Sequence, residues 1–501
     1  MGESVLVRGG RVVGLAEGEA TRAADVRIRD GLIVEVGPDL AVAGERLIDA
    51  AGAWLIPGLW DAHVHFTQYV RASTWVDVAG TSGPEEVCAR IAGDLAGRPD
   101  DGRAVIAFGY RSGPWSRVGT VAELDALSGG RPVVAIAGDV HNGWLNSAAL
   151  AAFGLPPREG PLVENDWFEV FGRLDDLPGA TPTPHREDAV AAELAARGLV
   201  GLVDLEFDSP FRAWPTRVER GLRSLRVRAG VYPHQLDDVL AAGWRTGDAL
   251  PGGLGLVTMG PLKIIVDGSM GTRTAWCCAP YCDASPTDPH PAGAPNHSTE
   301  ELRALFTRAR TAGLAVAAHA IGDRANAAVL DAFAATGASG SVEHAQLLQR
   351  QDVERFGRLE VTASMQPHHL VADRDPAGVL WADRTDRLYL ARSLLRSGAR
   401  LALGSDAPVS PPDPWLAIAT AVHRSGDGRA GWHPEESLSP REALAASVDG
   451  QRLAPGRPGD LVVLGADPLW ESDEPAETAA HLRAMPVRHT ICAGRLTHGE
   501  A

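Results

Sequence analysis

The chain has 501 residues, 45% of them hydrophobic, which is enough for a large α/β domain with smaller additions. Asp and Glu number 64 against 47 Lys and Arg, a net charge of −17, and this excess of negative charge disfavours nucleic acid and anionic membranes as partners. The start MGESVLVRGGRVVG has no basic leader, and no apolar run is long enough to span a bilayer, so we expect a cytoplasmic protein.

Both ends of the chain have the pattern of antiparallel β-hairpins. Short valine-rich runs alternate with glycine turns in SVLVRGGRVVG and ADVRIRDGLIVEVG, as hairpins require. A similar alternation of apolar runs and glycine turns is found in RPGDLVVLGADPLW and PVRHTICAGRLTHG near the other end. We therefore predict one composite β-sandwich domain, built from residues 1–54 and 455–501.

Between these ends, short apolar segments alternate with helical stretches such as EDAVAAELAARG, the pattern of βα units around a parallel sheet. Eight segments are predicted strands: WLIPGLWDAHVH, GLVGLVDLE, LRVRAGVY, PLKIIVDG, GLAVAAHA, GSVEHAQ, LEVTASMQP and RLALGSDAP. An eightfold alternation predicts the α/β class and a (β/α)8 TIM-type barrel, formed by residues 55–65 and 186–454. The active site of such a barrel lies at the C-terminal ends of its strands.

Two connections are too long for simple crossovers. Residues 66–185 carry more than one helix, so we predict an inserted subdomain after the first strand, over the barrel mouth. A proline-rich loop with the cluster WCCAPYC follows the fourth strand. Five cysteines, unevenly spread, do not indicate a disulfide framework. The cluster lacks paired CxxC spacing, so we interpret it as a loop with incidental cysteines, a zinc site being the alternative.

The stretch IPGLWDAHVHF places His63 and His65 at the end of the first predicted strand. Because side chains along a strand alternate, both imidazoles point to the same side and can hold one ion. Such a pair alone is more often structural, two hydrogen-bonded histidines at a strand end. The residues at the other strand ends are therefore needed to distinguish a metal-binding pair from a structural one.

Polar residues also stand at the C-terminal ends of the other predicted strands. The resulting set is His63, His65, Lys263, His319, His344 and Asp406. Four imidazoles and a carboxylate match the nitrogen and oxygen ligands that zinc prefers. Their shared position at the catalytic end of the barrel predicts a site for one or two divalent metal ions.

Lys263 is unusual in this set, because an ammonium ion would be repelled by a divalent cation. A deprotonated lysine that adds carbon dioxide becomes a carbamate, whose two oxygens can bridge two cations. The alternative is a free Lys263 that binds a substrate anion or pairs with Asp267.

These residues and several longer phrases carry a resemblance. The phrases are LIPGLWDAHVHF, DVHNGWLNSAAL, KIIVDGSMGTRTA, AAHAIGDRANAAVLDAF, VEHAQL, SMQPHHL and LGSDAPVSPPDPWLAIATAV. The sequence resembles the amidohydrolase superfamily and, within it, the amidohydrolase 3 group, the branch that includes N-substituted formamide deformylase. The resemblance runs from about Leu6 to the PGDLVVL stretch. Its motifs are specific for the superfamily and the branch but give little indication of the substrate.

The resemblance implies a metal-dependent hydrolase that cleaves an amide-type, non-peptide C–N bond of a small molecule. It implies that His63, His65, His319 and His344 hold metal and that Lys263 is carboxylated. Asp406 would contact the metal and accept a proton from the attacking water. Ester or cyclic-amide hydrolysis in the same site, or a barrel that binds a small molecule without turnover, are the alternatives. The expected partner is the substrate alone, apart from an optional second copy in a homodimer.

Further polar and aromatic residues are candidates for contact with the substrate: His141, Trp144, Arg273, Asp323, Gln366 and His369. Asp323 alternatively braces the rim of the barrel, and structural roles are the alternative for Gln366 and His369. His141 either donates a hydrogen bond to the substrate carbonyl, as a catalytic residue, or fixes its own loop. Arg273 either meets an anionic substrate group or forms a salt bridge within its loop. In DVHNGW, Val140 and Asn142 stand where the resemblance leads us to expect Gly and Ser.

Overall fold

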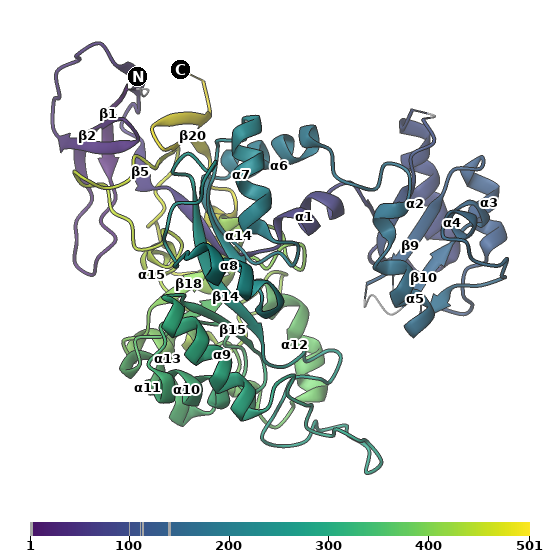
Figure 1. Cartoon of the computed structure of the whole chain (residues 1–501). Helices are drawn as coiled ribbons and strands as arrows, with labels where there is room; N and C mark the ends of the chain where they lie inside the picture. The colour runs from purple at the N-terminus through teal and green to yellow at the C-terminus, as the bar shows by residue number, and fades with distance from the viewer. Residues whose placement is uncertain (1–3, 100, 111, 113–114, 139–141, 501) are drawn as a thin grey trace. The chain divides into compact units, whose positions relative to one another are not determined.

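A computed structural model describes residues 4–99, 101–110, 112, 115–138 and 142–500 (Figure 1). The chain forms two compact units. Unit 1 comprises Met1–Phe66 and Asp188–Ala501, and unit 2 comprises Thr67–Glu187. No helix among the described residues combines the length and the apolar character that crossing a membrane requires.

The larger part of unit 1 is a parallel eight-stranded sheet that curls into a barrel, which confirms the predicted α/β fold. Its strands, in order around the barrel, are β6 (Leu59–Val64), β12 (Leu199–Asp204), β13 (Arg226–Val231), β14 (Val257–Ile265), β15 (Val316–Ala320), β16 (Gly340–His344), β17 (Thr362–Met365) and β18 (Leu401–Leu403).

Helices alternate with these strands and cover the outside of the sheet (Figure 1). They are α6 (Pro184–Ala196), α7 (Pro210–Arg220), α8 (Leu236–Ala242), α9 (Thr299–Ala312), α10 (Asp323–Thr336), α11 (Arg350–Arg358), α12 (His369–Leu380), α13 (Ala391–Arg396), α14 (Pro414–His423) and α15 (Pro440–Ala445), with 3-10 turns at Pro233–Gln235, Thr385–Arg387 and Pro434–Glu436. The boundaries of α9 follow from its sequence. Ser298 and Glu301 form a capping box, and Gly313 ends the helix in the left-handed conformation.

The barrel closes where the first and last strands meet. The backbone N–H of Asp406 donates to the His63 carbonyl at 2.7 Å, and the N–H of His65 donates to the Ala407 carbonyl at 2.9 Å. A Cβ on Gly404 would lie 2.7 Å from the His63 nitrogen, so this approach requires glycine. The junction therefore brings the His63–His65 pair beside Asp406.

The buried carboxylate of Asp61 fastens the same junction. One of its oxygens accepts from the Ser405 hydroxyl at 2.6 Å, and the other accepts from the backbone N–H groups of Ser405 and His63 at 2.9 and 3.1 Å. Burial raises the pKa of Asp61 to about 6 against the effect of these hydrogen bonds. Asp61 thus fixes the backbone that carries the histidine pair.

A second sheet of unit 1 joins strands from both ends of the chain. Its order is β21 (Arg495–His498), β20 (Val487–Cys492), β19 (Leu461–Leu464), β5 (Trp54–Pro57), β1 (Ser4–Val12), β2 (Arg22–Arg29) and β3 (Leu32–Gly37), with β4 (Arg46–Asp49) on β1. Antiparallel pairing of β19 with β5 makes the connection. The helix α16 (Pro475–Arg483) lies between β19 and β20 in the sequence.

The apolar run that we predicted as one barrel strand is divided in the structure. Residues up to Pro57 pair in the terminal sheet, and the barrel strand begins at Leu59. At Gly58 between them, a Cβ would lie 2.2 Å from the Val200 side chain. A continuous apolar run does not reveal such a break, because both halves are buried.

Unit 2 has its own sheet of five strands. They are β7 (Val76–Asp77), β8 (Val105–Tyr110), β9 (Val133–Ala137), β10 (Asn142–Leu145) and β11 (Leu162–Val163). The helices are α1 (Phe66–Ala72), α2 (Pro84–Gly97), α3 (Val121–Ser128), α4 (Ser147–Ala152) and α5 (Glu164–Phe171), followed by a 3-10 turn at Leu174–Asp176. Apolar clusters on the two faces of this sheet give the unit a core of its own.

Candidate metal centre

The structure brings the predicted strand-end residues together at the C-terminal end of the barrel sheet. His63 is central to the group. Its Nε2 lies 3.3 Å from Lys263 Nζ and 3.3 Å from Asp406 Oδ1. The same carboxylate oxygen lies 3.3 Å from His65 Nε2. Polar side chains in or just after β6, β14 and β18 therefore lie within contact of one another.

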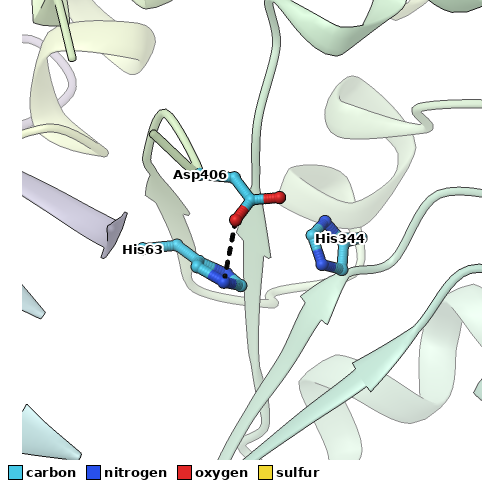
Figure 2. Close-up of side chains that lie close together, drawn as sticks. All are labelled: His63, His344 and Asp406. Atoms are coloured by element: carbon cyan, nitrogen blue, oxygen red, sulfur yellow. Dashed lines mark ion pairs between the residues drawn. The ribbon is translucent and has the colours of Figure 1, made fainter. Parts of the chain in front are cut away.

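His344 and His319 complete the group from the neighbouring strands. Ligand atoms of His63, His344 and Asp406 all lie within 4.8 Å of one another (Figure 2). The His319 ring meets the His344 ring edge-on, with a centroid distance of 4.5 Å. His319 Nε2 lies 3.6 Å from the buried carboxylate of Asp267.

The backbone at two of these positions is unusual. His344 has φ of 74° and Asp406 has φ of 57°, in the left-handed region that residues other than glycine seldom adopt. At His344 this turn lets two successive side chains, Glu343 and His344, both contact His63. Local strain of this kind is typical of functional sites, where the surrounding structure maintains it.

Burial keeps three of the imidazoles neutral. It lowers the pKa of His319 to about 3, and it is also the main cause that lowers the pKa of His63 and of His344. Burial also lowers the pKa of Lys263, although the carboxylates of Glu343 and Asp406 oppose this. A neutral imidazole has a free lone pair, which is the form that binds metal.

Asp406, in contrast, is held in its ionised form. Burial raises its pKa, but the close contacts of Oδ1 with His63 and His65, each at 3.3 Å, outweigh this effect and hold the pKa well below its usual value. Among the described residues, the buried Nδ1 atoms of His65 and His344 have no hydrogen-bond partner. The imidazole nitrogens and the carboxylate oxygen of His63, His344 and Asp406, which lie within 4.8 Å of one another, fit a divalent cation.

The sequence contained a further signal for Lys263. It is the only lysine in the chain, since the other 46 of the 47 basic residues are arginine. Its side chain is almost fully buried. Arginine stays protonated in proteins, whereas a buried lysine can lose its proton. Among the Lys and Arg side chains of the sequence, Lys263 is therefore the one that can readily lose its proton.

Glu343 is a member of the site that our sequence reasoning missed. His63 Nδ1–H donates to Glu343 Oε2 at 2.9 Å, and both side chains are buried. The Ser341 hydroxyl donates to the other oxygen of the carboxylate. Because His63 is protonated on Nδ1, its Nε2 lone pair is directed at the centre. The signal was the glutamate directly before His344 in VEH, two residues after Ser341 on the same strand face.

Replacing Glu343 with glutamine is expected to weaken metal binding by about 10- to 100-fold, the usual cost of losing a supporting contact to a metal-binding histidine. Glutamine keeps the size of the side chain but removes the negative charge that strengthens the bond to His63. The measurement is a competition titration against a chromophoric zinc chelator. The control is Glu354→Gln on the exposed face of α11. Equal metal affinity in Glu343→Gln and wild type would contradict this role.

Phe207 is a second residue that the sequence did not single out. Its ring stacks on the ring of His65 with a centroid distance of 5.4 Å, and the residue is 44% exposed. Its other neighbour is Tyr232, at 4.9 Å. An exposed aromatic ring against a predicted ligand gives the centre an apolar border.

Two candidates for substrate contact lie at or near the centre. His369, the first residue of α12, has its Nε2 3.9 Å from Asp406 Oδ2, and its ring stacks on His344 at 6.0 Å. Gln366 is buried just after β17, and its Oε1 has no partner among the described residues. Their contact with substrate stays a prediction.

The other candidates have partners elsewhere. Arg273 forms an ion pair with Asp283 in its own loop. Asp323 accepts hydrogen bonds from the Cys278 backbone, Gln349 and Arg387, and so braces the start of α10. Trp144 is buried in the core of unit 2. His141 lies outside the described residues. In the part of the chain that the structure describes, the cysteines of WCCAPYC join no cluster of metal-ligating groups.

Comparisons with known proteins agree with this geometry. A sequence profile of the amidohydrolase family, Amidohydro_3, matches residues 46–498. The YtcJ amidohydrolase of Bacillus subtilis is 27% identical over 97% of each chain. The N-substituted formamide deformylase of Arthrobacter pascens is 24% identical, over 89% of this chain and 90% of its own.

A solved structure is also similar over most of the chain. The metal-dependent hydrolase from Pyrococcus horikoshii matches with a TM-score of 0.78 at 26% identity, and the match covers 94% of this chain and 99% of that one. The profile, the relatives and the barrel with its buried cluster of metal-ligating residues point the same way. This chain belongs to the amidohydrolase family and has the fold of a metal-dependent hydrolase.

Proposed function

We propose that the protein hydrolyses an amide-type, non-peptide C–N bond of a small molecule in the cytoplasm, with one or two zinc ions. The observation that carries this proposal is the position of His63, whose Nε2 lies 3.3 Å from both Lys263 Nζ and Asp406 Oδ1. Imidazole and carboxylate ligands are those that zinc prefers. The similarity to a formamide deformylase supports a C–N bond as the target.

His63, His65, His319, His344 and Asp406 would hold the cation, with Lys263 at its edge. A bound divalent cation supplies Lewis acidity, which lowers the pKa of water and polarises a carbonyl group. Glu343 orients His63 from behind. Phe207 shields the opposite side of His65 from water.

We propose that Lys263 is carboxylated. Its buried amine has a lowered pKa, and a neutral amine can attack carbon dioxide. The N–C bond forms, one proton leaves the nitrogen, and the product is a carbamate with one negative charge on two oxygens. This charge removes the conflict between a lysine and a divalent cation. The uniqueness of this lysine in the chain supports the assignment.

Asp406 would move the proton during hydrolysis. Its carboxylate accepts a proton from the attacking water, whose oxygen adds to the substrate carbonyl carbon. The same proton then passes to the leaving nitrogen as the C–N bond breaks, which releases a carboxylic acid and an amine. A low pKa keeps Asp406 ionised before the reaction, and general acid–base catalysis of this kind contributes about 10²- to 10⁴-fold to the rate.

Matched substrates test the bond that is cleaved. N-formyl and N-acetyl amines, the corresponding esters and dipeptides, all with equal substituents, are incubated with zinc-loaded protein, and the released acid is measured. The expected result is a higher kcat/KM for the simple amides than for the dipeptides and esters. A preference of more than tenfold for dipeptides or for esters would contradict the proposed C–N bond.

A further inference from the structure

Unit 2 contains a pocket that the proposed hydrolytic centre does not use. It lies beside β8 and β10 and has a volume of about 270 Å³. A cavity of about 150 Å³ is already enough to hold benzene in another protein. The pocket of unit 2 is therefore large enough for a substituted aromatic ring.

Aromatic rings form much of the pocket wall. Tyr110, Trp115 and Trp144 all line it, and the rings of Tyr110 and Trp115 stack at 5.2 Å. The indole N–H of Trp115 donates to the Thr81 carbonyl at 3.1 Å, and that of Trp144 donates to the Thr120 carbonyl at 2.8 Å. With these N–H groups bonded to the backbone, the rings are held in place and offer apolar surface to the pocket.

The pocket reaches solvent between apolar residues. Val118 and Val163 both line it and are 55% and 57% exposed. No charged side chain is among the described lining residues. The polar groups there are Ser112 and the pair in which Tyr110 donates to the Asn142 amide oxygen. Such a lining suits an uncharged ligand with little hydrogen-bonding capacity.

We propose that this pocket, which we call the aromatic pocket, binds an uncharged aromatic group. Rigid rings can stack on a planar ligand with little loss of conformational entropy, whereas an ionised ligand would lose its hydration without gaining a counter-charge from the described lining residues. The occupant is a separate aromatic molecule. The proposal goes beyond the proposed hydrolysis, since binding here requires neither the metal nor turnover.

Calorimetric titration of the full-length protein with indole tests the proposal. We expect one saturable site, and at least tenfold weaker binding of tryptamine, which carries the same ring with a positive charge. Val163→Trp and Val118→Trp, which add bulk at the exposed edge of the pocket, should each weaken indole binding at least tenfold. Val42→Trp, at a 51% exposed position in unit 1, is the matched control and should bind as wild type does.

The outcomes separate this proposal from the hydrolytic one. The proposal that the aromatic pocket binds a ligand is contradicted if wild-type protein does not bind indole. It is also contradicted if Val163→Trp, Val118→Trp and Val42→Trp bind indole equally. Both results hold whether or not the protein hydrolyses amides. If tryptamine binds as tightly as indole, the proposal that the ligand must be uncharged is contradicted.

Discussion

Replacing Asp406 with asparagine is expected to lower kcat by about 10²- to 10⁴-fold, the usual contribution of a general acid–base group. Asparagine preserves the size of the side chain and can still offer an oxygen to a cation, but it cannot accept a proton at neutral pH. We therefore expect metal content to stay at one equivalent or more and KM to change much less than kcat. Steady-state kinetics and elemental analysis of the same preparation measure the effect.

Asp375→Asn is the control for this substitution. Asp375 pairs with Arg429 on the surface of unit 1, so the same chemical change there should leave kcat unchanged. Turnover of Asp406→Asn near the wild-type rate would show that Asp406 is a structural carboxylate and would contradict the proton transfer proposed for it.

Replacing Lys263 with alanine is expected to remove both metal and activity. The loss of affinity should exceed the about 10- to 100-fold that a supporting contact costs, because the proposed carbamate would bind the cation directly. A short carboxylate such as propionate, added in solution, should restore part of both by occupying the space that the side chain leaves. Bound metal after dialysis and hydrolysis rate are measured with and without propionate.

A spectroscopic test of the carbamate uses the uniqueness of Lys263. In wild-type protein equilibrated with ¹³C-bicarbonate, we expect a carbamate carbon resonance that is absent from Lys263→Ala. Any carbamate at the chain's amino terminus would appear in both proteins, so the variant is its own control. A wild-type spectrum identical to that of Lys263→Ala would contradict carboxylation.

The barrel could be predicted from the sequence because its strands are short, apolar and separated by helical stretches. Seven of the eight predicted segments contain a strand of the barrel sheet, and the eighth, PLKIIVDG, overlaps the second half of β14. The site residues could be predicted for a related reason: parallel strands end at the same edge of a sheet, so His63, Lys263 and Asp406 had to lie near one another. Distance along the chain did not matter.

Other features depend on three-dimensional contacts that the sequence does not show. The ends of β5 and β6 are separated at Gly58 by packing against Val200, and apolar periodicity does not register such packing. The role of Asp61 depends on hydrogen bonds from Ser405, and that of Glu343 on a hydrogen bond from His63, both far away in the sequence. Arg273 has a partner in its loop that no spacing rule predicts.

Metal dependence is the central claim, and a zinc titration of chelator-treated protein tests it most directly. Bound zinc and the rate of amide hydrolysis are measured together as zinc is returned, in the wild type and in a variant that carries both His63→Ala and His65→Ala. We expect the wild type to lose activity on chelation and to regain it in parallel with bound zinc, while the variant neither binds zinc tightly nor turns over. Full activity of the wild type without bound metal would contradict the claim.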